Sequence, residues 1–349
     1  MKKLSKLMAV VLAVAMVLAL AACGSTGGAA SGSAAPAASG SGAASGSGSA
    51  APAGDGQTYK IGICQLVQHE ALDAANQGFQ DALTEKLGDA VKFDDQNASG
   101  DSANCSTIVN GFVSDGDDLI LAIATSPLQA AAAATADIPV LGTAVTDYAT
   151  ALEISDWSGT VGTNVSGTSD LAPLDQQADM LHDLFPDAKN VGLLYCSAEP
   201  NSVYQCTVIE GYLKELGYNV TWYAFNDTND VTSVTETAAD NSDVIYIPTD
   251  NTAASNTEAI ANVVLAKKVP VIAGEEDIAR GCGVAALSIS YYDLGYQTGL
   301  MAYDILANGA DVSTMAVQTA PSVTKKYNAA NAEALGITIP DDYEAIAEN

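Results

Sequence analysis

From Tyr59 onward, short apolar runs alternate with longer stretches of helical periodicity. Runs rich in Val, Ile and Leu are typical of buried strands, and helices between them indicate βαβ units with parallel sheets covered on both faces. The sequence therefore predicts an α/β protein. The expected strands are YKIGICQL (59–66), VKFDDQN (91–97), DLILAIATS (118–126), IPVLGTAV (138–145), VGLLYC (191–196), NVTWYAF (219–225), DVIYIPT (243–249), VPVIAGE (269–275) and VAALSIS (284–290). The clearest expected helices cover 69–88, 127–137, 174–188 and 201–217.

Two distant parts of this alternation share one pattern. Residues 118–142 run from a strand through Thr-Ser and a helix to IPVLG, and residues 243–274 run from a strand through Thr-Asp and a helix to VPVIAG. The repeat favours two similar α/β lobes over one wide sheet. About 290 residues follow the amino-terminal region, which is a suitable length for two domains.

The amino terminus has the pattern of an export signal. Three lysines lie within the first six residues, an apolar stretch follows from Leu7 to Leu20, and small residues come next. That stretch is too short for a membrane-spanning helix. The tetrapeptide LAAC resembles the lipobox of bacterial lipoproteins. We therefore expect residues 1–22 to be a signal peptide and Cys23 to be lipidated, which would hold the protein at a membrane surface. A plain signal peptide with an incidental cysteine is the alternative.

Residues 23–57 consist mainly of Gly, Ser, Ala and Pro, so we expect a flexible tether between the lipid anchor and the folded part. The expected location is outside the cytoplasm, on the outer face of the cytoplasmic membrane or, where an outer membrane exists, on the periplasmic side.

Composition argues against several classes of function. The formal charge of −29, from 13 Lys and Arg against 42 Asp and Glu, repels phosphate backbones, so nucleic acid is not an expected partner. Two distant histidines and the lack of a C-x-x-C spacing oppose a metal site, and we expect no metal and no cofactor. The five cysteines after Cys23 are an odd number, so disulfide pairing stays open. They are Cys64, Cys105, Cys196, Cys206 and Cys282.

Short polar and acidic residues follow most of the expected strands. Ligands of open parallel sheets bind beyond the carboxyl ends of the strands, so these residues are candidates for a site. Acidic groups suit an ammonium, and helix N-termini suit a carboxylate, which favours a neutral amino acid as the ligand. Thr125-Ser126 and Asn201-Ser202 are also expected N-caps, a role that alone accounts for their types. The candidates are Gln65, Thr125, Ser126, Thr146, Asp147, Tyr148, Glu199, Asn201, Ser202, Asp250, Asn251, Glu275 and Glu276.

The same positions offer little for catalysis. A cysteine nucleophile needs a nearby base, and no histidine stands at a strand end to serve Cys196. His182 falls within a helical pattern, and His69 stands near the start of a helix. The acids at 275–277 are compatible with acid–base chemistry, with a cation site or with a solvated loop. The sequence therefore favours a binding protein over an enzyme.

Nine segments together resemble the substrate-binding lipoproteins of ABC importers, in the family that includes tryptophan- and tyrosine-binding proteins. The resemblance extends from Tyr59 to about Ala320, and EPNS and PTDN are its most specific parts. It implies a type I periplasmic-binding-protein fold, with two doubly wound parallel-sheet lobes, three crossing segments and a ligand enclosed by hinge closure. The segments are IGICQLVQHEALDAANQGF, DDQNASGD, DLILAIATSPLQAAAAAT, IPVLGTAVTD, NVSGTSDLAPLDQQ, VGLLYCSAEPNS, VIYIPTDNTAAS, VPVIAGEEDIARG and ISYYDLGYQTG.

The resemblance implies an aromatic amino acid, Trp, Tyr or Phe, as the ligand, and an ABC permease with its ATPase as partners. We expect a monomer, with residues 58–172 and 292–317 in one lobe and 173–291 and 318–349 in the other. The α-carboxylate is expected at Thr125, Ser126, Asn201 and Ser202, and the ammonium at Asp250 with Glu275 or Glu276. Gln65, Asp147 and Tyr148 are expected to line the side-chain pocket. The chain has Tyr148 where the family tends to have Pro, and this departure concerns that pocket.

Other functions stay open at this point. The same fold could serve a surface adhesin or a sensory module, or it could bind a sugar or a branched-chain amino acid. An exported hydrolase that uses Cys196 or the acids at 275–277 is a further alternative.

Overall fold

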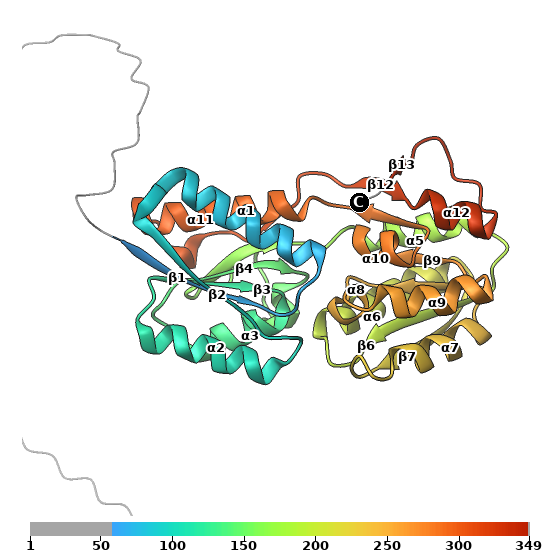
Figure 1. Ribbon diagram of the computed structural model, residues 1–349, viewed down its shortest axis with the longest axis horizontal. Coiled ribbons are helices and arrows are strands. Elements are labelled where there is room, and N and C mark those ends of the chain that lie inside the picture. Colours follow the sequence, from blue (N-terminus) through green and yellow to red (C-terminus); the bar gives the residue numbers. More distant parts are fainter. Residues whose placement is uncertain (1–57, 348–349) are drawn as a thin grey trace, which may run out of the picture. The chain divides into compact units, whose positions relative to one another are not determined.

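The computed structural model describes residues 58–347 and contains two sheets (Figure 1). The first sheet has the order β11-β5-β4-β3-β1-β2, and all its strand pairs are parallel. Its strands are β1 (Tyr59–Gln65), β2 (Val91–Asn97), β3 (Leu119–Ile123), β4 (Val140–Val145), β5 (Val165–Ser169) and β11 (Gln318–Thr319). The helices of this first lobe are α1 (Glu70–Leu87), α2 (Ser102–Asp115), α3 (Thr125–Ala134), α4 (Tyr148–Ala151) and α11 (Tyr291–Asn308).

The second sheet has the order β13-β12-β10-β9-β8-β6-β7, and only the β10–β12 pair among its described strands is antiparallel. Its strands are β6 (Asn190–Cys196), β7 (Asn219–Phe225), β8 (Val244–Ile247), β9 (Val271–Ala273), β10 (Ala285–Ser288), β12 (Thr324–Tyr327) and β13 (Glu344–Ala345). The helices of this second lobe are α5 (Leu174–Leu184), α6 (Pro200–Glu215), α7 (Val231–Asn241), α8 (Asn251–Ala254), α9 (Thr257–Lys267), α10 (Glu276–Gly281) and α12 (Ala329–Leu335).

Helices α1 and α11 lie side by side on one face of the first sheet, and α2 and α3 lie on the other (Figure 1). The α1–α11 contact depends on glycine. A Cβ atom on Gly295 would lie 1.8 Å from the carbonyl oxygen of Ala75, and one on Gly299 would lie 2.7 Å from that of Phe79. Only residues without a side chain allow the two backbones to approach this closely.

The second sheet is also covered on both faces. Helices α5 and α6 pack with Val191 and Leu193 on one face, whereas α7, α9 and α10 pack with Leu194 and Ile245 on the other. Neighbouring strand residues therefore point into two different cores, which explains why β6 and β8 are apolar almost throughout.

The predicted α/β class with two parallel-sheet lobes is confirmed, and every expected strand overlaps an observed one. Strand β5 was not predicted because its sequence, VSGTS, is polar, although all of its residues are buried. Its hydroxyl groups are paired: Ser166 donates to the Met315 carbonyl, and Thr168 bonds to Thr143 and Thr298. Buried hydroxyls with such partners are compatible with a core strand.

The chain passes between the two sheets three times within residues 58–347: from β5 to α5, from β10 to α11, and from β11 to β12. Two expected boundaries need a correction. Tyr291 was expected in the second lobe, but it begins α11 and belongs to the core of the first lobe. Gln318 and Thr319 were expected in the second lobe, but they pair with Thr168 and Ser169 of β5 in the first sheet.

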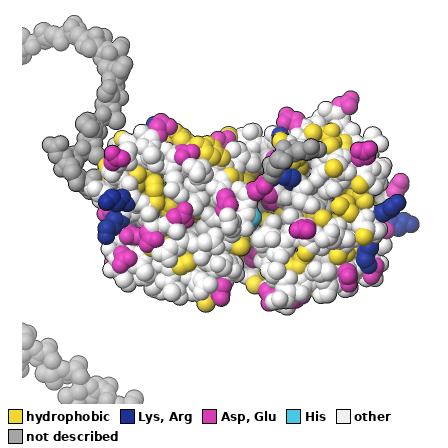
Figure 2. Space-filling model, viewed as in Figure 1, with side chains coloured by type: hydrophobic (Ala, Val, Ile, Leu, Met, Phe, Trp, Pro, Cys, Tyr) yellow, Lys and Arg dark blue, Asp and Glu magenta, His cyan; other side chains and the backbone are white. Residues whose placement is uncertain are grey.

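The expected signal peptide, the lipidated Cys23 and the tether lie outside the described residues. Between residues 58 and 347, none of the helices combines the length and the apolar character that a bilayer-spanning segment requires. Figure 2 shows acidic side chains distributed over the visible face, whereas basic side chains gather in a few places, as expected from the formal charge of −29.

Candidate ligand-binding site

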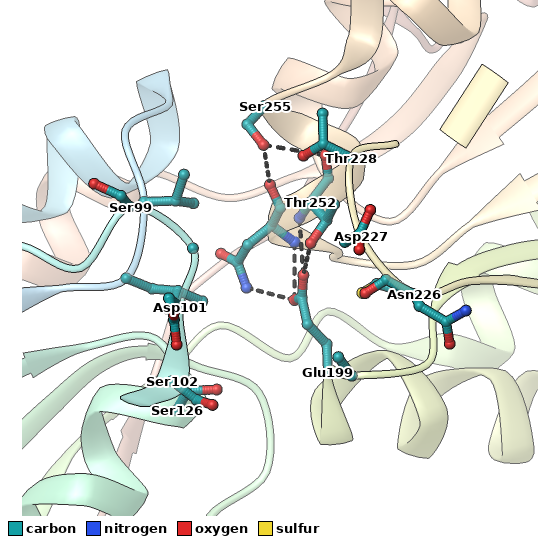
Figure 3. Close-up of a pocket in the computed structure, with 16 residues that line it drawn as sticks. Ser99, Asp101, Ser102, Ser126, Glu199, Asn226, Asp227, Thr228, Thr252 and Ser255 are labelled. Atoms are coloured by element: carbon teal, nitrogen blue, oxygen red, sulfur yellow. Dashed lines mark hydrogen bonds between the residues drawn. The ribbon is translucent and has the colours of Figure 1, made fainter. Parts of the chain in front are cut away.

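Strand ends from both sheets surround a pocket of about 390 Å³, which we call the large pocket. Its lining comes from the segments after β1, β2, β6 and β7, from the start of α3 and from α8. Leu66 and Val67 give it an apolar wall. Figure 3 shows the polar residues of the two lobes facing one another, with Ser99, Asp101, Ser102 and Ser126 opposite Glu199, Asn226, Asp227, Thr228, Thr252 and Ser255. This position and volume are typical of a small-molecule site.

A second pocket, the small pocket, shares Asn251 with the large one and measures about 10 Å³. This volume is close to what one water molecule, or a group of that size, requires. Acidic side chains from both lobes line it. The full lining is His69, Leu72, Ala144, Thr146, Asp170, Asn201, Thr249, Asp250, Asn251, Ala254, Glu275 and Tyr291.

Two of these acids, Asp250 and Glu275, cap helices. Asp250 accepts hydrogen bonds from the backbone N–H groups of Cys196 (2.7 Å) and Ala253 (2.8 Å), at the start of α8. Glu275 accepts from the N–H groups of Asp277 and Ile278 at the start of α10. Burial raises the pKa of Asp250 to about 8, and the charge of Glu199 adds to this effect. Burial likewise raises the pKa of Glu275 to about 8, with a contribution from the charge of Asp277.

The third acid, Asp170, follows β5 and is 4% exposed. One of its oxygens, Oδ2, accepts from the Tyr291 hydroxyl at 3.0 Å. Burial raises the pKa of Asp170 to about 6, while the hydroxyl groups of Tyr291 and Thr146 act in the opposite direction. Asp170 is therefore mostly ionised above neutral pH.

Glu199 organises the second-lobe side of both pockets. Its carboxylate accepts five hydrogen bonds, from the backbone N–H and side-chain amide of Asn251, from the N–H and hydroxyl of Thr252, and from the amide of Asn201. Since Glu199 is 4% exposed, these donors replace water around its charge. The bonds hold the β6–α6 junction against the start of α8.

Two contacts connect the lobes beside the pockets. His69, just before α1, lies 3.2 Å from Asn251 Oδ1 through its Nε2 atom. Arg280 of α10 forms an ion pair with Glu70 of α1 and also with Glu276 and Asp277. The only arginine in the sequence is thus engaged by carboxylates of the protein itself.

Three comparisons with known proteins show the family and the fold of this chain. Residues 60–349 match the model of the family described as ABC transporter substrate binding protein. The chain belongs to this family. Proteins of this family are solute receptors rather than enzymes, and those of ABC importers work outside the cytoplasm.

A tyrosine-binding protein of Clostridioides difficile (strain R20291) is 38% identical to this substrate-binding protein over 262 residues, which cover 74% of this chain and 75% of the relative. A Streptococcus pneumonia protein solved in complex with L-Trp is 34% identical, with a TM-score of 0.78 over 82% of this chain and 97% of the other. A ligand-free, open structure of a substrate-binding protein with adhesive properties from Clostridium difficile is 37% identical. Its TM-score is 0.64 over 84% of this chain and 100% of the other. The fold is that of type I periplasmic binding proteins.

The structure of this substrate-binding protein brings seven of the predicted site residues to the two pockets. Their roles in ligand binding stay predictions. They are Ser126, Thr146, Glu199, Asn201, Asp250, Asn251 and Glu275.

Six predicted residues do not line either pocket. Tyr148 is 1% exposed in the core of the first lobe and donates to the Thr168 carbonyl. Gln65 is buried, and its amide bonds to Val67, Asp73 and Asn76 within the first lobe. The remaining four are Thr125, which is buried at the start of α3; Asp147, which caps α4; Ser202, which is fully buried in α6; and Glu276, which binds Arg280 and Ser288.

The expected N-caps also need a correction. Helix α6 begins at Pro200 with Glu199 as its N-cap, so Asn201 and Ser202 lie within its first turn. Helix α3 begins at Thr125, and its N-cap is Ala124, which has a positive φ of 88° and offers no side-chain acceptor. Proline at the first helical position accounts for the earlier start of α6.

Three residues outside the predicted site, His69, Asp170 and Tyr291, meet at the small pocket from three separate segments. Asp170 follows a strand that has no apolar signature, and Tyr291 starts α11 after a crossing between the sheets. Cys196, the nucleophile considered in the sequence, lines the large pocket but is 1% exposed. Burial, with the charge of Asp250, raises the pKa of this thiol to about 11, which opposes nucleophilic chemistry.

The raised pKa of Glu275 predicts a pH dependence of stability. Its pKa rises from 4.5 to about 8 on folding, so the folded protein holds this proton more tightly than the unfolded chain. The resulting stabilisation is complete below pH 4.5 and is lost as pH rises through about 8. We expect the melting temperature of the ligand-free protein to fall between pH 5 and pH 9, and Glu275→Gln to reduce this fall. The exposed Glu236→Gln serves as a control; equal pH profiles for the two variants would contradict the assignment.

Proposed function

We propose that this protein is the receptor of an ABC importer for an aromatic amino acid, which it binds between its two lobes. The observation that supports this most strongly is the adjacency of an acid-lined pocket of ammonium size to a pocket of about 390 Å³ with an apolar wall. An amino acid has the matching chemistry, with a cationic group next to a larger side chain.

The relatives support the aromatic class. One relative is named for tyrosine binding, and a structural neighbour holds L-Trp. The ligand would place its side chain in the large pocket, against Leu66 and Val67. Its α-carboxylate would lie near Ser126, at the N-terminus of α3, where Ala124 leaves the first N–H groups without a side-chain acceptor.

The proposal extends to the position of the protein in the cell. Lipidation of Cys23 would anchor the folded lobes to the outer face of the cytoplasmic membrane, or on the periplasmic side where an outer membrane exists, through the tether of residues 23–57. The ligand would pass to a permease driven by its ATPase. We propose that the receptor works as a monomer, and that its lobes divide close to the boundaries expected from the sequence, with Tyr291, Gln318 and Thr319 moved to the first lobe.

Thermal unfolding of the protein, measured without ligand and then with each of the twenty amino acids or glucose added, tests the ligand class. A ligand at 100 times its Kd stabilises the folded state by about 2.7 kcal/mol, a shift of several degrees. We expect this shift with Trp, Tyr or Phe, and a smaller one or none with leucine and glucose. The proposal is refuted if none of the three aromatic amino acids stabilises the protein.

Adhesion is a second candidate, because one neighbour at 37% identity is a substrate-binding protein with adhesive properties. Binding of the purified protein to host cells, measured with and without saturating ligand, would test it. Adhesion as the main function predicts strong cell binding together with an absence of amino acid binding.

A further inference from the structure

Two residues that line the small pocket each have a buried side-chain atom without a hydrogen-bond partner within residues 58–347. The atoms are Oδ1 of Asp170 and Nδ1 of His69. Buried polar atoms are rarely left unpaired, because each loses its interaction with water. Two such atoms beside one small pocket indicate that a bound group satisfies them.

The hydrogen bonds of Asn251 determine which ring nitrogen of His69 carries the proton. The amide nitrogen of Asn251 donates to Glu199 at 2.7 Å, so its oxygen Oδ1 faces His69. The Nε2 atom of His69 must therefore carry the proton that this oxygen accepts. Burial lowers the pKa of His69, which keeps the ring neutral. A neutral ring with its proton on Nε2 has a free lone pair on Nδ1, so His69 has an unused acceptor beside the pocket.

Asp170 differs from the other two acids of the pocket in how its oxygens are used. Both oxygens of Asp250 accept from backbone N–H groups, and so do both oxygens of Glu275. Asp170 has one oxygen bound by Tyr291 and one unpaired. Its free oxygen is therefore the carboxylate atom of this pocket with the greatest remaining capacity to accept.

The group that satisfies both atoms is small and donates at least two hydrogen bonds, and the carboxylate of Asp170 favours one that is cationic. The space of about 10 Å³ admits a group of the size of water. A divalent metal ion fits less well, since no group of three or more His, Cys, Asp or Glu side chains between residues 58 and 347 is arranged to hold one. A primary ammonium has the required size, charge and three donors.

We propose that Asp170 and His69 form the ammonium subsite of the receptor, while Asp250 and Glu275 serve mainly as helix caps. This inference rests on the proposed function and assigns the recognition of the amino group within it. Asp170 supplies the counter-charge, Tyr291 orients it, and His69 accepts a second hydrogen bond. A ligand that lacks the amino group leaves both acceptors unpaired, so the receptor rejects it.

Calorimetric titration with matched ligands tests the assignment. The two ligands are L-tyrosine and 3-(4-hydroxyphenyl)propionate, which differ only in the amino group. We expect the wild-type protein to prefer L-tyrosine on the order of 100-fold, the scale for a buried charge that loses its partner. Asp170→Asn should reduce this preference to a few-fold, mainly by weakening the binding of L-tyrosine. Asp250→Asn, a matched change in the same pocket, should keep most of the preference.

His69→Phe provides a second test on a residue that is only half-buried. It keeps a ring but removes the acceptor, and we expect it to reduce the preference about tenfold. Melting temperatures of the ligand-free variants show that each is folded. The proposal is wrong if Asp170→Asn and His69→Phe keep the wild-type preference, or if Asp250→Asn loses more of it than Asp170→Asn.

The same experiment separates this inference from the proposed function. If the wild-type protein binds a non-aromatic amino acid instead, the aromatic proposal fails. The ammonium subsite is then tested by the same titrations with that amino acid and its analogue without the amino group. If it binds no amino acid, both proposals fail.

Discussion

Glu199→Ala should lower the free energy of unfolding by about 3–5 kcal/mol, the range for removing one partner from a buried charged network. The substitution leaves five donors without their acceptor, on Asn201, Asn251 and Thr252. These donors lie where water has little access, since Glu199 is 4% exposed and Asn251 is 8% exposed. Urea denaturation, followed by circular dichroism, measures the change.

Glu199→Gln is the control for this prediction. Its amide oxygen still accepts, so we expect a smaller loss of stability than with alanine. The same bonds hold Asn251 against His69, so ligand affinity should fall in both variants. A stability loss below about 1 kcal/mol for Glu199→Ala, within the range of a surface pair, would contradict the structural role of this residue.

The second large loss of stability is expected from truncation of the Tyr148 side chain. The side chain is 1% exposed among the core residues of the first lobe, and its hydroxyl donates to Thr168 at 3.1 Å. Truncation of a buried aromatic residue costs about 3–5 kcal/mol, so Tyr148→Ala should destabilise the protein to that extent. Because Tyr148 lines neither pocket, the folded variant should bind its ligand with unchanged affinity.

Tyr148→Phe isolates the hydroxyl group, and we expect a loss of about 1–2 kcal/mol from the unpaired Thr168 carbonyl. Both variants are measured by denaturation and by ligand titration at a temperature where they are folded. Loss of ligand binding with little loss of stability would show that the sequence-based assignment of Tyr148 to the side-chain pocket is right and its placement in the core is wrong.

The fold was largely predictable because its central strands are buried on both faces. Such strands are apolar throughout, and the helices between them have helical periodicity, so β1 and β8 are visible in the sequence. Strand β5 is not, because Ser166 and Thr168 reach buried positions through hydrogen bonds to distant residues. A local pattern contains no information about such distant partners.

The site was predictable only in part, for a related reason. Asp250 and Glu275 follow apolar strands, so their position at a strand end is visible in the sequence. Asp170 follows the polar strand β5 and was missed with it. Tyr148 stands just beyond a strand end, yet its side chain turns into the core, a direction that position in the sequence does not determine.

A crystal structure of the protein with L-tyrosine tests the central claim most directly. We predict one ligand between the two lobes, with its amino nitrogen within hydrogen-bond distance of Asp170 and His69 and its ring in the large pocket. A ligand that binds outside both pockets, or one whose amino group points away from the small pocket, would contradict the account.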